Sequence, residues 1–100
     1  MSKSTQTFKI TINSVISRNP GQQFSKIDGE VVMLSLNAGE YLALNDSASR
    51  IWDLLDQPQR VSELIRILTE EYQIDFEECK SDTLSCLADF GMKSIIEISN

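Results

Sequence analysis

Two cysteines, Cys79 and Cys86, are the most reactive side chains of this 100-residue sequence, which contains no histidine. If the segment is a helix, their spacing puts them on one face, roughly 10 Å apart along the axis at about 1.5 Å per residue. A disulfide needs Cα atoms within about 7 Å, so these two thiols do not bridge each other. A zinc site needs more ligands of this kind. We therefore predict two buried thiols that act as small hydrophobic residues.

Carboxylates can act as general acids and bases, but here they are spaced as on solvated helix faces. They are Glu70, Glu71, Glu77, Glu78, Asp82 and Asp89. The absence of histidine removes the usual Ser-His or Cys-His nucleophile pair. Gly29 and Gly39 fit hairpin turns rather than a phosphate-binding loop. We therefore predict a protein that is not an enzyme, with no cofactor and no metal.

The composition is that of one small globular domain, with 41% hydrophobic and 24% charged residues. The net charge of -6 disfavours nucleic acid or an anionic membrane as a partner. The sequence has neither the apolar run of a signal peptide nor a stretch near the roughly 18 residues of a membrane span. We expect a cytoplasmic protein, with a flexible segment at residues 1–13 and a single domain at residues 14–98.

The first structural elements to expect are short antiparallel strands. The predicted strands cover residues 22–27, 30–36 and 40–44, after a short apolar segment at residues 14–18. Asp28-Gly29 is a strong two-residue hairpin signal, because both positions need positive φ. Asn37-Ala38-Gly39 predicts a second hairpin, with Gly39 in the left-handed position of a bulged turn. This third of the chain therefore predicts a three-stranded antiparallel meander.

Two amphipathic helices are expected after the meander. Asn45 or Asp46 can cap the first helix, and Gln57-Pro58-Gln59 ends it. Its apolar residues at helical spacing are Ala48, Ile51, Trp52 and Leu55. The second helix is expected from about Arg60 to Tyr72. Its apolar stripe is Val61, Leu64, Ile65, Leu68 and Tyr72.

A third helix is expected to start at Asp75, where Asp and Glu78 form a capping-box pattern. Its main apolar row is Phe76, Cys79, Thr83, Cys86, Leu87 and Phe90, and beside it run Leu84, Ala88 and Gly91. Residues 95–98 suit a short edge strand or an apolar tail that docks on the core. Three strands followed by three helices predict an α+β fold of the winged helix-turn-helix-like kind.

The segment from Gly29 to Leu55, followed by residues 61–75 and an acidic third helix, resembles the PqqD-like family. These proteins are precursor-peptide recognition elements of pathways that modify ribosomally made peptides. The resembling positions are Gly29, Glu30, the strand 31–36, Gly39, Tyr41, Leu44, Asn45, Ile51, Trp52, Leu54, Leu55, Val61, Glu63, Leu64, Tyr72, Asp82 and Leu87. The resemblance extends over roughly residues 14–98.

One pattern within this resemblance points to a variant of the family. The run from Gly39 to Asn45, Gly-x-Tyr-x-x-Leu-Asn, is similar to the standalone recognition proteins of lasso-peptide clusters. PqqD proper more often has a Pro-Glu-Gly turn and no such tyrosine. Two positions depart from the family pattern: Ser94 stands where Gly is usual, and Arg60 stands where a capping Thr is common.

The resemblance implies that a leader segment adds as a strand to the edge formed by residues 40–44 and lies against the third helix. That edge has no Pro or Lys to guard it. The implied peptide-binding residues are Val31, Met33, Tyr41, Leu42, Ala43, Leu44, Asp82, Thr83, Leu84, Leu87, Ala88 and Gly91. Leu42, Leu44 and Leu87 compete as core residues, whereas Leu84 and Ala88 lie off the core stripe. Asp82 and Asp89 would select Lys or Arg on the leader.

The function implied is non-catalytic leader binding and presentation to a separate leader protease or other maturation enzyme in a lasso-peptide pathway. One alternative is PqqD-type delivery of a precursor to a radical SAM enzyme. A structural subunit whose edge pairs with another protein is a second alternative. A winged-helix DNA-binding protein is a third, but Glu77, Glu78 and Asp82 on the third helix would be repelled by phosphates.

Overall fold

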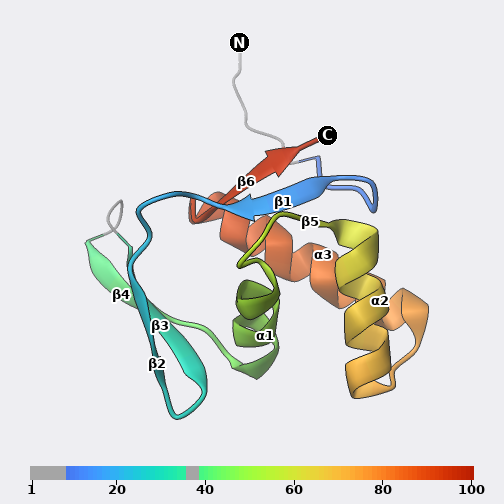
Figure 1. Ribbon diagram of the computed structural model, residues 1–100, viewed down its shortest axis with the longest axis horizontal. Helices are drawn as coiled ribbons and strands as arrows, with labels where there is room; N and C mark the ends of the chain where they lie inside the picture. Colours follow the sequence, from blue (N-terminus) through green and yellow to red (C-terminus); the bar gives the residue numbers. More distant parts are fainter. Residues whose placement is uncertain (1–8, 36–38) are drawn as a thin grey trace.

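Two small antiparallel sheets and three helices surround one hydrophobic core in the computed structural model, which describes residues 9–35 and 39–100 (Figure 1). In chain order the elements are β1 (Val15–Arg18), β2 (Phe24–Ile27), β3 (Glu30–Ser35), β4 (Glu40–Ala43), α1 (Asp46–Leu54), β5 (Gln59–Arg60), α2 (Val61–Tyr72), α3 (Phe76–Met92) and β6 (Ile96–Ser99). The predicted α+β class is therefore confirmed.

The first sheet is the predicted meander, with strand order β2-β3-β4. Asp28 and Gly29 have φ values of 53° and 85°, so the hairpin between β2 and β3 has the two positive φ angles that the Asp-Gly pair predicted. Gly39 also has a positive φ, 67°. The predicted turn residues Asn37 and Ala38 lie outside the described residues. This sheet stands beside the helices, as Figure 1 shows.

A second sheet, with strand order β5-β1-β6, was not predicted. β1 pairs with both β5 and β6, so the segment at residues 14–18 lies at its centre. The expectation of one N-terminal sheet was incomplete because the partners of β1 lie far along the chain, β5 after α1 and β6 after α3. The proposed edge strand at residues 95–98 is present, one residue later, and pairs Arg18 with Ile96.

The helices begin where their capping residues predicted. The Asn45 side chain accepts a hydrogen bond from Ala48 N at 2.9 Å, and Asp75 accepts from the backbone N–H of Glu77 and Glu78. Arg60 precedes α2 without a side-chain cap. Tyr72 and Phe76 were wrongly placed in the apolar stripes: they are 48% and 49% exposed, because each lies at a helix end beyond the reach of the core.

Trp52 is the centre of the core and is 0% exposed. Its ring packs edge-on against Phe24 of β2 and Phe90 of α3, with centroid distances of 5.5 and 6.1 Å. The Arg18 guanidinium lies 4.6 Å from the Trp52 ring centroid and 4.9 Å from that of Phe24. Trp52 therefore connects the β2-β3-β4 sheet to the helices.

Ser94, which directly precedes the buried pair Ile95-Ile96, has a φ of 61°. A residue with a side chain in the left-handed region costs about 1–2 kcal/mol of stability. Glycine avoids this cost, but its greater freedom in the unfolded chain cancels part of the gain. We predict that Ser94→Gly raises the free energy of unfolding by about 0.5–1 kcal/mol in urea titrations. Ser81→Gly, in the exposed middle of α3, should lower it instead; a loss with Ser94→Gly would contradict the prediction.

Candidate functional site

Within the described residues, β4 is one of the two free edges of the first sheet, since it pairs with β3 alone, and β2 is the other. Leu44 N donates to Val31 O at 2.9 Å, and Leu42 pairs with Met33 in the same register. Alternate residues of an antiparallel strand point their backbone groups to opposite sides. The N–H and C=O groups of Tyr41 and Ala43 therefore point away from β3, toward the open edge.

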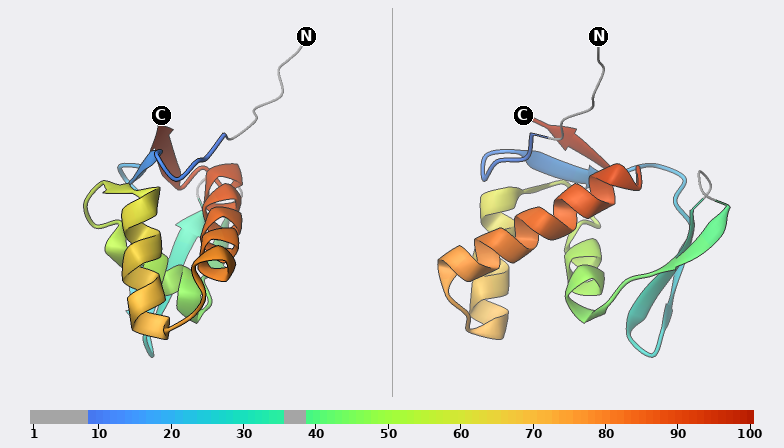
Figure 2. Two further views of the ribbon diagram at one scale, coloured as in Figure 1. Left: turned by 90° about the vertical axis from the view of Figure 1, so that its right-hand side faces the viewer. Right: turned by 180° about the vertical axis from the view of Figure 1, so that it is seen from behind.

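A groove of about 700 Å³ begins just beyond the end of β4. Its lining comes from the residues that follow β4, from the ends of α1 and α2, and from one flank of α3. The lining residues are Asn45, Asp46, Ser47, Ala48, Ile51, Leu68, Tyr72, Ile74, Glu78, Cys79, Asp82, Thr83, Ser85, Cys86 and Asp89. Seen from behind in Figure 2, α3 crosses in front of α1, and β4 leads directly into α1.

The groove combines an apolar floor with an acidic rim. Ile51, Leu68 and Cys79 of the floor are buried, and Asp46, Glu78, Asp82 and Asp89 lie on the rim. No Lys or Arg is among the lining residues. Asp89 pairs with Lys93 at 2.5 Å at the edge of the groove. The groove therefore suits an apolar segment that carries positive charge.

Cys86 lies in the α3 wall of this groove. Burial, together with the nearby Asp89 carboxylate, raises the pKa of the Cys86 thiol to about 12. The thiol therefore stays protonated at neutral pH, which disfavours a nucleophilic role. The sequence-based prediction of a buried thiol is confirmed for Cys79 and holds in part for Cys86, which keeps some exposure.

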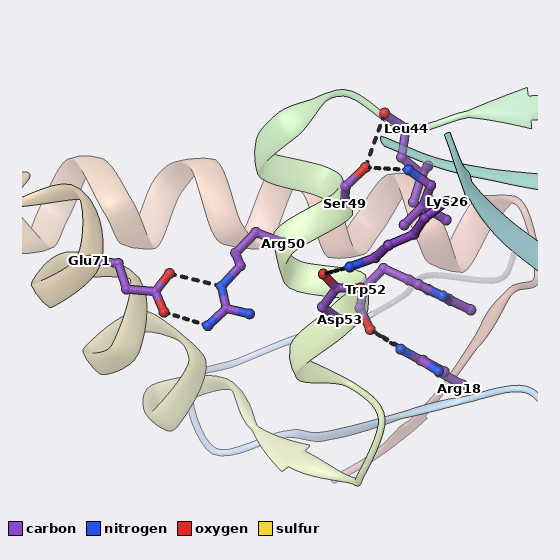
Figure 3. A network of polar contacts seen from close by, with 9 residues as sticks. Arg18, Lys26, Leu44, Ser49, Arg50, Trp52, Asp53 and Glu71 are labelled. Atoms are coloured by element: carbon purple, nitrogen blue, oxygen red, sulfur yellow. Dashed lines mark hydrogen bonds and ion pairs between the residues drawn. The ribbon is translucent and has the colours of Figure 1, made fainter. Parts of the chain in front are cut away.

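Helix α1, which lines the groove, is joined to the first sheet by two sets of contacts (Figure 3). Ser49 Oγ accepts from Val31 N at 2.9 Å and donates to Leu44 O at 3.1 Å, which joins α1 to the sheet. Lys26 of β2 pairs with Asp53 at 2.6 Å.

On its other side, α1 is joined to α2. Arg50 Nε donates to Glu71 Oε1 at 2.9 Å, and a second nitrogen donates to Oε2, which makes a bidentate pair. Hydrogen bonding to Arg50 lowers the pKa of Glu71. The pair holds the two helix ends that line the groove.

The family model of coenzyme PQQ synthesis protein D (PqqD) matches residues 30–96, from the start of β3 to the start of β6. This chain belongs to the PqqD family. The comparison with curated proteins gives no match.

Two solved structures are similar to this PqqD-family chain. The structure of TbiB1 in complex with the TbiA(beta) leader peptide has a TM-score of 0.74 and 31% identity, covering 81% of this chain and 94% of that one. The solution NMR structure of the PqqD truncation of Methylobacterium extorquens PqqCD, described as a functional and stand-alone RiPP recognition element, has a TM-score of 0.74. Its identity is 23%, over 89% of this chain and 95% of that one. The second likeness supports the fold.

The structure shows where the residues predicted for the peptide site of this PqqD-family protein lie. Four of them are buried in the hydrophobic core: Val31, Met33, Leu44 and Leu87. Val31 and Met33 pair with Leu44 and Leu42 on the face of the sheet that packs on the helices. A strand with apolar residues on both faces does not reveal from sequence which face is inside.

Other predicted residues fall on different sides of α3. Leu84 and Ala88 lie about 160° around the helix from Cys86, so they are on the flank opposite the groove. Gly91 is buried. Asp82 and Thr83 do line the groove, with Asp82 exposed. On β4, Tyr41 is 77% exposed, Ala43 is exposed, and Leu42 packs partly against the core.

Sequence reasoning missed the contribution of α1 and α2 to the groove. Asp46, Ser47, Tyr72 and Ile74 come from helix ends that the sequence treats as caps and connections. No sequence signal marks Tyr72, because this residue continues the apolar stripe of its helix and only the structure shows that it is exposed. Among residues 9–35 and 39–100, no group of three or more Cys, Asp or Glu side chains is placed to hold a metal ion. No helix in these ranges is long and apolar enough to cross a membrane.

Proposed function

We propose that this PqqD-family protein binds the leader segment of a ribosomally made precursor peptide and presents it to a separate maturation enzyme. The observation that carries the proposal is the free edge of β4, with the backbone groups of Tyr41 and Ala43 pointing outward beside an apolar groove. An extended peptide that adds to such an edge gains main-chain hydrogen bonds, and the neighbouring groove supplies specificity. The role needs no catalytic group.

The similarity to TbiB1 supports leader binding by this protein. TbiB1 is 31% identical to this chain and was solved with a leader peptide bound. In our proposal the leader forms a fourth strand beside β4 and packs against the α3 flank that carries Asp82, Thr83 and Cys86. We place this step in the cytoplasm, where ribosomally made precursors first appear.

We further propose a lasso-peptide pathway, with a leader protease as the receiving enzyme. The Gly39-x-Tyr41 pattern supports it, because Tyr41 projects from the edge strand and is 77% exposed. A tyrosine that is not used in packing is free to contact the leader. Delivery to a radical SAM enzyme is the less favoured pathway.

A DNA-binding role is disfavoured by charge. Helix α3, the counterpart of a recognition helix, has Glu77, Glu78 and Asp82 exposed, and Asp89 beyond them. DNA affinity depends on neutralising phosphates, which these carboxylates oppose. The same carboxylates favour a cationic peptide.

The proposed function predicts that the purified protein binds a leader peptide without any other component. The probe is the fluorescein-labelled leader of the precursor encoded beside this gene, titrated by fluorescence anisotropy. We expect a Kd on the order of 1 μM, and a scrambled peptide of the same composition should bind at least about tenfold more weakly. Absence of binding at about 100 μM protein would overturn the proposal.

A further inference from the structure

The groove continues the line of the free strand edge rather than lying apart from it. Asn45, Asp46 and Ser47 line the groove and come directly after the last residues of β4. A segment that pairs with Tyr41 and Ala43 and remains extended therefore runs into the groove. The bound segment is then longer than the four-residue strand that it pairs with.

The direction of the added strand decides which end of the peptide enters the groove. Both existing pairings in this sheet are antiparallel, and antiparallel pairing is slightly more stable per residue than parallel pairing. An antiparallel partner of β4 runs from the Ala43 side toward the Gly39 side. Its N-terminal residues therefore lie opposite Asn45 and Asp46. Counting along the strand, they are about two to four residues before the one that faces Ala43.

The chemistry of the groove defines the side chain that it accepts. Ala48, Ile51 and Leu68 offer apolar surface, whereas Asp46, Glu78 and Asp82 place carboxylates at the rim. These three carboxylates make no ion pair with any described residue, unlike Asp89 with Lys93. A Lys or Arg side chain fits both parts, because its aliphatic stem packs on apolar surface while its charged end reaches the carboxylates.

We infer that the groove is a specificity site for a Lys or Arg that the peptide carries just N-terminal to its β4-paired stretch. The inference rests on the proposed function, and it adds the class of residue and its position along the peptide.

A selection from random peptides tests the inference without knowledge of the natural leader. Random linear peptides displayed on phage are selected on the purified protein and sequenced. We expect Lys or Arg to be enriched about two to four residues N-terminal to an alternating apolar stretch. Selection on the triple variant Asp46→Asn/Glu78→Gln/Asp82→Asn should abolish that enrichment. Peptides from the first selection should bind this variant about tenfold more weakly.

The matched control is Glu77→Gln/Glu30→Gln/Glu97→Gln, which removes the same charge from exposed positions outside the groove. It should retain the enrichment and the affinity. Three results would overturn the inference and leave strand addition standing. They are selected peptides without basic enrichment, selected peptides with the basic residue on the C-terminal side, and an enrichment that is unchanged in the groove variant. Two other results would overturn the proposed function itself and the inference with it. Either the selection recovers no peptides, or the recovered peptides bind the Ala43→Pro variant as well as they bind the original protein.

Discussion

Replacing Ala43 by proline is expected to weaken leader binding at least about tenfold while leaving the free energy of unfolding nearly unchanged. The Ala43 N–H points to the open edge of β4, so its loss breaks no hydrogen bond of the sheet. Proline removes that donor, and its ring occupies the position of the incoming strand. Leu42, which precedes it, is already extended, as proline requires of its neighbour.

The matched control for this variant is Ala43→Val, which keeps the N–H and suits a strand. Anisotropy titrations with the labelled leader should give similar Kd values for Ala43→Val and the original protein. Urea unfolding of all three proteins verifies that the fold is retained. Unchanged affinity of the proline variant would show that the leader does not pair with β4, even if it binds elsewhere on the protein.

The part of the fold that sequence predicted well is the part held by local signals. Asp28-Gly29 requires positive φ at both positions, and the structure has both. Asn45 and Asp75 are small polar residues placed directly before apolar helical repeats, and both cap helices. Such features depend on a few neighbouring residues, so the local sequence suffices to predict them.

The second sheet was missed because its pairing is entirely non-local. Val15 pairs with Arg60 on one side and Ser99 on the other. Neither partner segment has a turn signal that connects it to β1, and β5 has only two residues. Pairing of this kind is decided by how the helices pack, which local patterns do not determine.

The structure places the residues predicted for the candidate site in the core, on the strand edge and on both flanks of α3. The edge strand and Asp82 follow from chain order and the family resemblance. The choice between Leu84 and Cys86 as groove residues depends on how α3 rotates about its axis. Both lie beside the buried row of Cys79 and Leu87, so the sequence leaves that rotation open. The structure resolves it through the packing of α3 on α2 and β6.

Replacing Trp52 by alanine is expected to have the largest effect on stability. Removing a fully buried Trp costs about 3–5 kcal/mol, which is a large share of the about 5–15 kcal/mol that stabilises a small domain. The Trp52 ring packs against Arg18, Phe24 and Phe90, which belong to three different elements, and alanine reaches none of them. We therefore expect extensive unfolding near body temperature, measured by far-UV circular dichroism because the chain has no other tryptophan.

The control is Trp52→Phe, which keeps an aromatic ring between Phe24 and Phe90 and should cost about 1–2 kcal/mol. A destabilisation below about 1 kcal/mol for Trp52→Ala would contradict the central position of this residue. The two variants also separate stability from recognition. Because Trp52 connects the β2-β3-β4 sheet to the helices, Trp52→Ala should lower leader affinity and stability together. Ala43→Pro should lower affinity alone, since the Ala43 N–H is proposed to pair with the leader and the exposed Ala43 side chain lies outside the core.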